Sequence, residues 1–263
     1  MLSLVAALVL GAKSPDRKEK MKSSLLGMSL MVLALAACQS AQPEAQNQAS
    51  PAPSVVAPNV QATGSLCDNP YMPAVEGAAW TSNLHTQQGD VTQVDTITDA
   101  GSDAFLVETV RPNTDYVVTW YCTPEGLLWL QTDGGMFSGI FQTEGLTQTW
   151  ETVSYDGVSL PKDIQPGDTW SSSQQLKATD STGSRQFDIN IDFQAVGMES
   201  VTVPAGTFNA MRIDIAMGFK YADIETSYQI SDWFAPGVGM VKSSAQSDFG
   251  GDYDLALESF AIP

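Results

Sequence analysis

Regular alternation of apolar and polar residues is the feature that most limits how this chain can fold. Residues 187–193 read Phe-Asp-Ile-Asn-Ile-Asp-Phe, and residues 211–219, 224–230 and 253–257 repeat the same period of two. Successive side chains of an extended strand point to opposite faces, so this period places the apolar residues on one side. The four segments therefore predict β-strands with one face buried and the other in solvent.

Further strands are expected where the same pattern recurs more weakly, at residues 91–98, 103–111, 115–122, 126–132, 147–154 and 169–179. Turn-forming pairs such as Asp156-Gly157 and Gly250-Gly251 separate strands of this kind. No amphipathic run of helical period reaches four turns. The predicted class is all-β: a strongly curved antiparallel meander sheet of about ten or more strands, forming a half-barrel or open barrel that hides its edges.

The apolar residues of neighbouring strands are expected to share one inner face of this sheet. A one-residue slip of either strand would turn its whole apolar set to water, which fixes the register. If the face encloses a cavity, its lining is apolar and suits an acyl chain better than a charged metabolite. The possible ligand-facing residues are Phe187, Ile189, Ile191, Phe193, Met211, Ile213, Ile215 and Met217.

The amino-terminal segment has the order of a secretory signal peptide. Basic residues gather between Lys13 and Lys22, and an apolar run follows from Leu25 to Ala37. That run is shorter than the roughly 20 residues that a membrane-spanning helix needs. Met21 begins a compact signal peptide by itself, so residues 1–20 are either an over-extended start or a long basic region.

The end of the apolar run, Leu35-Ala36-Ala37-Cys38, resembles the lipobox of bacterial lipoproteins. The resemblance implies cleavage before Cys38, acylation of its sulfur and new amino terminus (palmitate being the usual type of chain), and stable membrane attachment. It implies a place in the cell envelope, on the outer membrane if there are two membranes and otherwise on the outer face of the cell membrane. An ordinary signal peptide, with Cys38 as an unrelated residue, is the alternative.

Composition divides the rest of the chain into a tether and a body. Residues 38–66 are rich in Ala, Gln and Pro and lack aromatic residues, which predicts a disordered tether with a span of about 30 Å. Residues 67–263 are numerous enough to bury one hydrophobic core, and the segment is short for two domains. The predicted organisation is a signal peptide at 1–37, the lipidated Cys38 and its tether at 38–66, and a single antiparallel β domain at 67–263.

Two cysteines remain once Cys38 is set aside for acylation. Cys67 and Cys122 form an even pair in an exported chain, where oxidation is the ordinary outcome. The pair predicts a disulfide between the start of the β domain and the end of the strand at 115–122. Reactive thiols are the alternative, but neither cysteine belongs to a Cys-X-X-Cys motif.

The charge of the chain argues against nucleic-acid binding. Its 12 Lys and Arg residues against 30 Asp and Glu residues give a formal net charge of −18. Five of those basic residues precede Cys38, so a cleaved chain is more acidic still. Nucleic-acid binding needs clustered Lys and Arg side chains, which the body lacks.

Candidate catalytic and metal-binding residues are few. His85 is the single histidine, so no metal site is predicted from several histidines, and neither a nucleophile elbow nor a phosphate loop is present. Paired carboxylates, for which Glu125, Glu144, Glu151 and Asp168 are candidates, would allow glycoside hydrolysis. Calcium is the one cofactor that the surplus of carboxylates would suit, at 188–192 or 250–254, although neither segment matches a known calcium loop.

Three segments resemble landmarks of an uncharacterised family of bacterial envelope lipoproteins. They are Pro161–Trp170, Val201–Arg212 and Trp233–Lys242. Members of that family are similar in outline to the curved β half-barrel of periplasmic lipoprotein carriers. The resemblance implies a strongly bent sheet with an apolar concave face, but this chain offers no helix to close that face as the carriers do.

Two functions are consistent with these observations. The favoured hypothesis is a non-catalytic lipoprotein that binds a lipid, a lipoprotein segment or another envelope partner on its apolar concave face. The alternative is an envelope glycan hydrolase that uses paired carboxylates. A purely structural or partner-docking lipoprotein is a third hypothesis, which the sequence does not separate from the first. The oligomeric state stays open.

Overall fold

The computed structural model describes residues 65–112, 114–130, 149–221, 224–247 and 251–263. In these residues the chain forms one antiparallel sheet of 13 strands and no helix, which confirms the predicted all-β class. No described segment has the helical length and hydropathy that crossing a bilayer requires. The strands are β1 (Ala79–Thr86), β2 (Gly89–Ala100), β3 (Ala104–Arg111), β4 (Thr114–Cys122), β5 (Gly126–Leu130), β6 (Thr149–Gly157), β7 (Leu160–Pro161), β8 (Thr169–Asp180), β9 (Gly183–Val203), β10 (Gly206–Tyr221), β11 (Ile224–Ala235), β12 (Gly239–Ser247) and β13 (Tyr253–Ala261).

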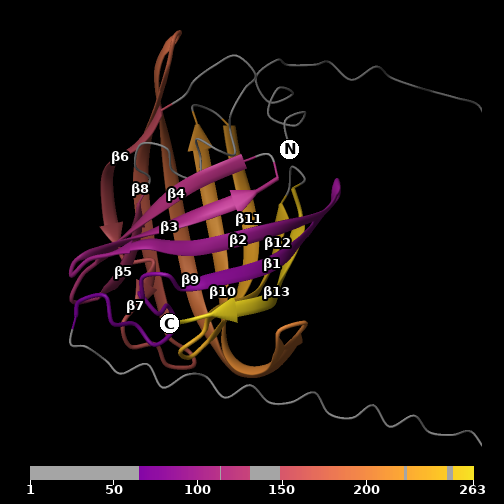
Figure 1. Ribbon diagram of the computed structural model, residues 1–263. Coiled ribbons are helices and arrows are strands. Elements are labelled where there is room, and N and C mark those ends of the chain that lie inside the picture. The colour runs from indigo at the N-terminus through magenta and orange to yellow at the C-terminus, as the bar shows by residue number, and fades with distance from the viewer. Residues whose placement is uncertain (1–64, 113, 131–148, 222–223, 248–250) are drawn as a thin grey trace, which may run out of the picture.

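Two meanders, joined by their first and last strands, make up the sheet. Strands β8 to β13 follow one another, as do β1 to β5, and β13 pairs with β1 so that Leu84 lies opposite Leu255. Figure 1 shows β1–β5 crossing in front of the long strands β8–β12. The two halves therefore face each other across a common interior. Within the described residues β6 and β7 are the two edges of the sheet and do not pair, so the sheet is open.

The long strands have the register that their alternation predicts. Ile191 of β9 lies opposite Met217 of β10, and Phe193 lies opposite Ile215. Directly paired residues point to the same side of a sheet, so this register gathers the apolar residues of both strands on one face. We call it the inner face, and it includes Ile191, Phe193, Ile213, Ile215 and Met217.

The hydrophobic core joins the inner faces of both halves. Ile97 and Phe105 of the first meander belong to the same buried cluster as Leu176, Ile189 and Met211 of the second. Each of these side chains is at most 2% exposed. Burial at this level stabilises by about 1.5–3 kcal/mol for each large apolar side chain. The core is thus shared by the two halves of the sheet.

A disulfide fastens the start of the described chain to this core. Cys67 and Cys122 are bonded across a sequence separation of 55 residues, which confirms the predicted pair. Both residues are buried, and the Cys122 backbone N–H donates to Asp103 O at 2.8 Å. The bond ties the segment that precedes β1 to the end of β4.

Two turns have structural roles. β9 ends at Val203 and β10 begins at Gly206, so Pro204 and Ala205 form a tight hairpin between them. After Pro236, Gly239 has a φ of +104°, and a Cβ there would lie 3.4 Å from the indole Nε1 of Trp80. That Nε1 donates to Val238 O at 2.6 Å. The second turn therefore packs tightly against β1.

Candidate functional site

The eight residues that are predicted from the sequence to face a ligand fall into two groups. The group in the packed core, each side chain at most 8% exposed, comprises Ile189, Ile191, Phe193, Met211 and Ile213. Phe187, Ile215 and Met217 are only partly buried and pack against that core. Because the side chains of the first group are buried, they are not accessible to a ligand in this structure.

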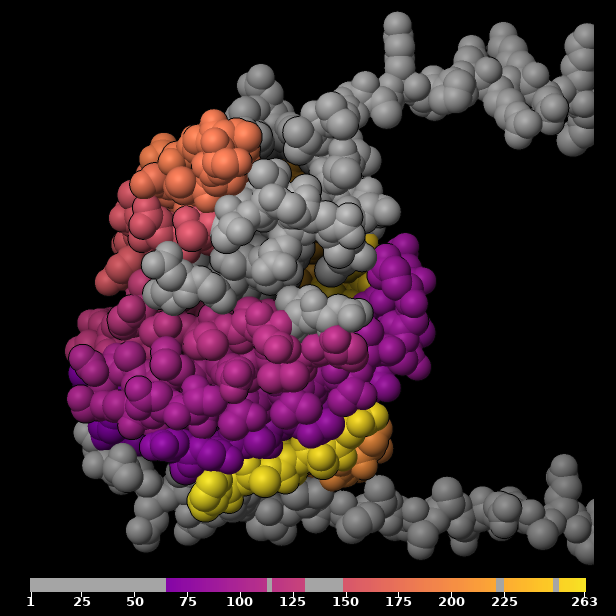
Figure 2. Space-filling model, turned by 45° about the horizontal axis from the view of Figure 1, so that its top comes forward, coloured from indigo at the N-terminus to yellow at the C-terminus, as the bar shows by residue number. Residues whose placement is uncertain are grey.

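Partly exposed apolar side chains nevertheless form a continuous strip on the inner face. The inner apolar strip consists of Trp170, Phe187, Ile215, Met217 and Phe219, all partly buried. Trp170 stacks on the buried Phe193 with ring centroids 5.1 Å apart, and Phe187 packs on Phe219 at 5.2 Å. Figure 2 shows the first meander, coloured indigo to magenta, across the front of the molecule, with atoms of the C-terminal strands in yellow below and behind it. The strip offers apolar surface beside a core that is otherwise filled.

A hydrogen-bonded polar network lies on the inner side of β2, β3 and β4. Arg111 donates from Nε and Nη2 to Gln93 Oε1 at 2.9 and 2.6 Å, and its Nη2 lies 3.3 Å from the Tyr116 hydroxyl. Gln93 Nε2 in turn donates to Asp95 Oδ2 at 2.7 Å, and Thr109 Oγ1 donates to Asp95 Oδ1 at 2.5 Å. Desolvation raises the pKa of Asp95 despite these donors. The network holds one carboxylate and one guanidinium without a direct ion pair between them.

A second carboxylate, Asp232 of β11, lies on the inner face of the other half. It pairs in register with Ile213 of β10 and with Ser243 of β12, both of which are buried. Desolvation raises the pKa of Asp232 to about 6, and a hydrogen bond with the Ser243 side chain only partly opposes this effect. The Ser243 hydroxyl lies 3.2 Å from the hydroxyl of Tyr253, whose pKa desolvation raises to about 12. Asp232 is therefore a desolvated carboxylate with the Ser243 hydroxyl as its hydrogen-bond partner.

Several buried polar atoms of the inner face have no hydrogen-bond partner. They are Trp170 Nε1, Ser172 Oγ, Thr226 Oγ1 and Asp232 Oδ1. The strand registers place all four residues on the inner face, opposite Phe193, Ile191, Phe219 and Ile213 respectively. Buried polar groups are normally hydrogen-bonded, and each exception calls for a reason such as a bound water or a ligand. The inner face thus combines apolar surface with unused donors and acceptors.

This polar set was not predicted from the sequence. The strand predicted at 224–230 stops short of Asp232, although Ile224, Thr226, Tyr228, Ile230 and Asp232 form one alternating series. Extending that series by one step would have placed a carboxylate on the buried face. A polar residue at an inward position was the available signal.

The other candidate carboxylates have surface or turn positions. Glu151 pairs with Lys177 at 2.9 Å on the exposed side of β6 and β8. Asp168 accepts from the Gln165 backbone N–H at 2.8 Å, and Glu125 is exposed in the turn between β4 and β5. Glu144 and Cys38 lie outside the described residues. The described candidates therefore have local structural roles, and the glycan-hydrolase alternative stays a prediction.

His85 and the metal candidates are similarly placed at the surface. His85 lies in β1, is exposed, and its Nδ1 is 2.5 Å from Asp90 Oδ1. The hydrogen bond with Asp90 raises the pKa of His85. Among the described residues no three His, Cys, Asp or Glu side chains gather as metal ligands. Asp188 accepts from Gln175 Nε2 at 3.2 Å.

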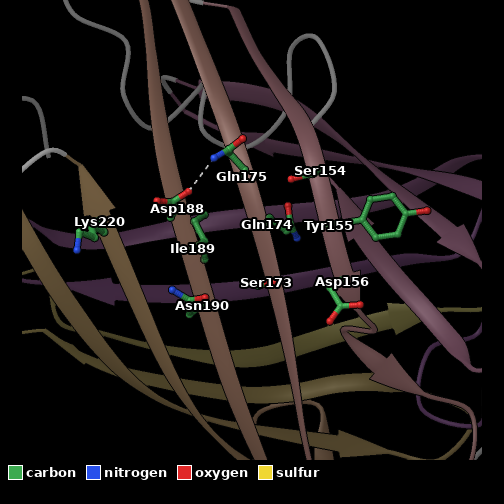
Figure 3. Close-up of a pocket in the computed structure, with 10 residues that line it drawn as sticks. All are labelled: Ser154, Tyr155, Asp156, Ser173, Gln174, Gln175, Asp188, Ile189, Asn190 and Lys220. Carbon is green, nitrogen blue, oxygen red and sulfur yellow. Dashed lines mark hydrogen bonds between the residues drawn. The ribbon is translucent and has the colours of Figure 1, made fainter.

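The outer face carries a shallow polar groove over β6, β8, β9 and β10. Its volume is about 410 Å³, and Figure 3 shows a lining that is mostly Ser, Gln, Asp, Asn and Lys, together with Tyr155 and Ile189, and the hydrogen bond between Gln175 and Asp188. A second groove of about 650 Å³ lies over β8, β9, β10 and β11, and its lining includes Asp192, Asp214 and Gln229 as well as Trp170, Phe193 and Ile215. Apolar ligands need apolar, concave surface, which favours the inner face as the binding site.

Replacing Asp232 by Asn is expected to stabilise the protein at neutral pH. A raised pKa means that the folded state binds the proton more tightly than the unfolded state, so the stabilising effect of protonation is complete below about pH 4 and is lost as the pH rises through 6. Ionised Asp232 then costs up to about 3 kcal/mol at pH 7. Asp232→Asn should raise the free energy of unfolding by up to that amount at pH 7 and by almost nothing at pH 4.

Urea unfolding at both pH values tests this expectation. Asp192→Asn, on the exposed outer side of β9, is the matched control and should leave stability nearly unchanged. Because Asp95 also titrates in its buried network, the difference between variant and wild type, rather than the wild-type profile, isolates Asp232. An equal gain at pH 4 and pH 7 would contradict the assignment.

Comparisons with known proteins bear on the fold. The family model described as DUF3108-like matches residues 135–250, which is less than half of the chain. A lipoprotein structure from Parabacteroides distasonis aligns with a TM-score of 0.48 at 16% identity, over 74% of this chain and 99% of that chain. No curated protein matches. A protein from Bacteroides fragilis is named as an exported protein with a YmcC-like fold. Its structure aligns with a TM-score of 0.50 at 16% identity, over 74% of this chain and 100% of that chain. The described β body is therefore similar in fold to that protein.

Proposed function

We propose that this protein is a lipid-anchored envelope lipoprotein whose β body binds an acyl chain on its inner face without catalysing a reaction. The observation that carries the proposal is the inner apolar strip, which stays partly exposed next to a filled core. Exposed apolar surface of this kind marks binding sites in soluble domains. The exported protein of similar fold supports an envelope location.

The strip has the chemistry that an acyl chain requires. Ile215, Met217 and Phe219 follow one another along β10, and Phe187 and Trp170 flank them from β9 and β8. Met adapts to irregular apolar ligands because its side chain is unbranched and flexible. Each methylene that moves from water to this surface contributes about 0.8 kcal/mol, so about ten buried methylenes supply the roughly 8 kcal/mol that corresponds to micromolar binding.

A chain-length series tests acyl binding. The mature chain from Gln39 to Pro263, exported behind an unrelated signal peptide so that the disulfide forms, is loaded with a fluorescent apolar probe such as N-phenylnaphthylamine. Straight-chain alcohols should displace the probe, and their affinity should increase about fourfold for each added methylene, the factor that 0.8 kcal/mol gives. Displacement that does not depend on chain length would refute the proposal.

A pair of variants locates the binding surface. Met217→Lys places a charge in the inner apolar strip and should weaken alcohol binding at least tenfold. Ala216→Lys places the same charge on the neighbouring residue of β10, which points to the outer face, and should leave binding unchanged. Equal effects of the two substitutions would mean that the alcohols bind elsewhere.

The membrane anchor is tested separately. We expect Cys38→Ser to give an uncleaved precursor without acyl chains, because a hydroxyl does not replace the sulfur in lipid transfer. Metabolic labelling with an alkyne analogue of palmitate measures this, with Cys67→Ser as the control that keeps Cys38. Equal labelling of the wild type and Cys38→Ser would exclude a lipobox at this position.

A further inference from the structure

The Asp232 carboxylate is the best-defined polar feature of the inner face that no contact explains. Its Oδ1 atom is buried and has no hydrogen-bond partner, whereas Ser243 bonds its side chain from the next strand. The residue as a whole is only partly buried, whereas Oδ1 itself has no solvent contact, so a ligand must displace the atoms that cover Oδ1 to reach it. A buried acceptor without a donor is costly, and a donor supplied by a ligand would remove that cost.

The charged groups around Asp232 do not supply that donor. Tyr253 of β13 faces it, and its hydroxyl is engaged with Ser243. Arg111 of β3 is close enough to influence Tyr253, but its guanidinium donates to Gln93 and Tyr116. Asp95 of β2 is bonded to Gln93 and Thr109. Among these groups Asp232 Oδ1 is therefore the acceptor without a donor, while the other unpartnered atoms of the inner face belong to Trp170, Ser172 and Thr226.

Asp232 also lies in line with the inner apolar strip. Along β11 the inward positions run Asp232, Ile230, Tyr228 and Thr226, and on β10 they are paired with Ile213, Ile215, Met217 and Phe219. Inward positions of one strand are about 6.7 Å apart, so the carboxylate and the far end of the strip are separated by about 20 Å. This spacing suits a long extended alkyl chain with a polar head at one end.

We propose that the inner face binds a single-chain amphipath with a cationic amine head, the amine pairing with Asp232 and the alkyl chain lying along Ile215, Met217 and Phe219. The inference rests on the proposed function and names the head group that the site selects. An ammonium group provides three donors and the charge that a desolvated carboxylate lacks. The acidic chain, with a net charge of −18, also favours a cation over a fatty-acid carboxylate.

The pairing implies that affinity depends on pH. In the free protein Asp232 is mostly ionised at pH 7 and mostly protonated at pH 5, because its pKa is about 6. An amine binds the ionised form, so its affinity should fall about tenfold between pH 7 and pH 5. An uncharged alcohol of the same length has no ion pair to lose and should bind almost equally at both values.

Three single-chain compounds of equal length, used as probes of the head group, are dodecylamine, dodecanol and dodecanoate. Each is titrated, below its critical micelle concentration, into the mature chain loaded with N-phenylnaphthylamine, and displacement of that fluorescent molecule reports the affinity. At pH 7 dodecylamine should bind at least tenfold more tightly than dodecanoate. Asp232→Asn should abolish this preference and leave dodecanol binding unchanged, and Asp192→Asn on the outer face should preserve it. The pH dependence in the wild type gives a second measurement that needs no variant.

The outcomes separate this inference from the function on which it rests. Failure of all three probes to bind would overturn the acyl-binding proposal itself. Binding of all three with equal affinity would leave acyl binding in place and refute the amine head. An amine preference that survives in Asp232→Asn, or that does not change between pH 7 and pH 5, would exclude Asp232 as its partner.

Discussion

Replacing Cys67 and Cys122 together by Ser is expected to lower the free energy of unfolding by about 4 kcal/mol. The disulfide closes a loop across 55 residues, and the chain-entropy estimate for a loop of that length gives this value at 25 °C. Both sulfur atoms lie in buried residues, so two hydroxyl groups would add a desolvation cost. Urea unfolding of the mature chain, followed by circular dichroism, measures the loss.

Two controls separate the bond from the side chains. Reduction of the wild type with dithiothreitol should reproduce most of the loss without any substitution. The single Cys122→Ser variant should be close to the double variant, since either change breaks the same bond. A reduced wild type as stable as the oxidised protein would show that the bond contributes nothing.

Phe105→Ala is expected to destabilise the protein by about 3–5 kcal/mol, the range for large aromatic side chains in a packed core. Phe105 of β3 is 1% exposed and belongs to the cluster that includes Ile189 and Met211 of the other meander. Its ring also stacks on Trp120 with centroids 6.1 Å apart. Because both halves of the sheet share this core, we expect one cooperative transition at a lower urea concentration rather than separate unfolding of the halves.

Thermal and urea unfolding with two probes test this result. Tryptophan fluorescence and far-ultraviolet circular dichroism should report the same midpoint in the variant. Val153→Ala on the exposed edge strand β6 removes a side chain that is 49% exposed and should change stability by less than about 0.5 kcal/mol. Two separate transitions in Phe105→Ala would mean that the halves fold independently.

The alternation in the sequence was enough to predict most of the strands. The expected segments at 103–111, 115–122 and 169–179 correspond closely to β3, β4 and β8. Their register follows from the need to bury one face, which the chain itself encodes. The lipobox at Cys38, the domain boundaries and the likeness to lipoprotein carriers stay predictions.

The strands β1 and β12 were not predicted, for a physical reason. Their inward positions include small polar residues: Ser82 in β1 and Ser243 in β12, each 2% exposed. A buried serine looks like a solvent-facing residue in a hydrophobic pattern, so the alternation is hidden. Instead, both strands are fixed by pairing with β13, which lies between them in the sheet.

The site was harder to predict than the fold. Alternation shows that Ile189 and Ile213 share a face with Ile215, but it does not show which part of that face the first meander covers. That coverage depends on the bend of the whole sheet, which puts Ile189 and Ile213 in the core and leaves Ile215 partly exposed. The role of Asp232 likewise follows only from what surrounds it.

The disulfide also determines which strand bears a mechanical force that is applied to the amino-terminal segment. A pull on the chain before Cys67 passes through the sulfur atoms into the end of β4, which is hydrogen-bonded on both sides, to β3 and β5. Without the bond, the same pull would act on the irregular segment before β1 and peel it away from the sheet one contact at a time. If the proposed acylation at Cys38 holds the body to a membrane, an interior strand therefore carries the force, and many hydrogen bonds must break together before the structure yields.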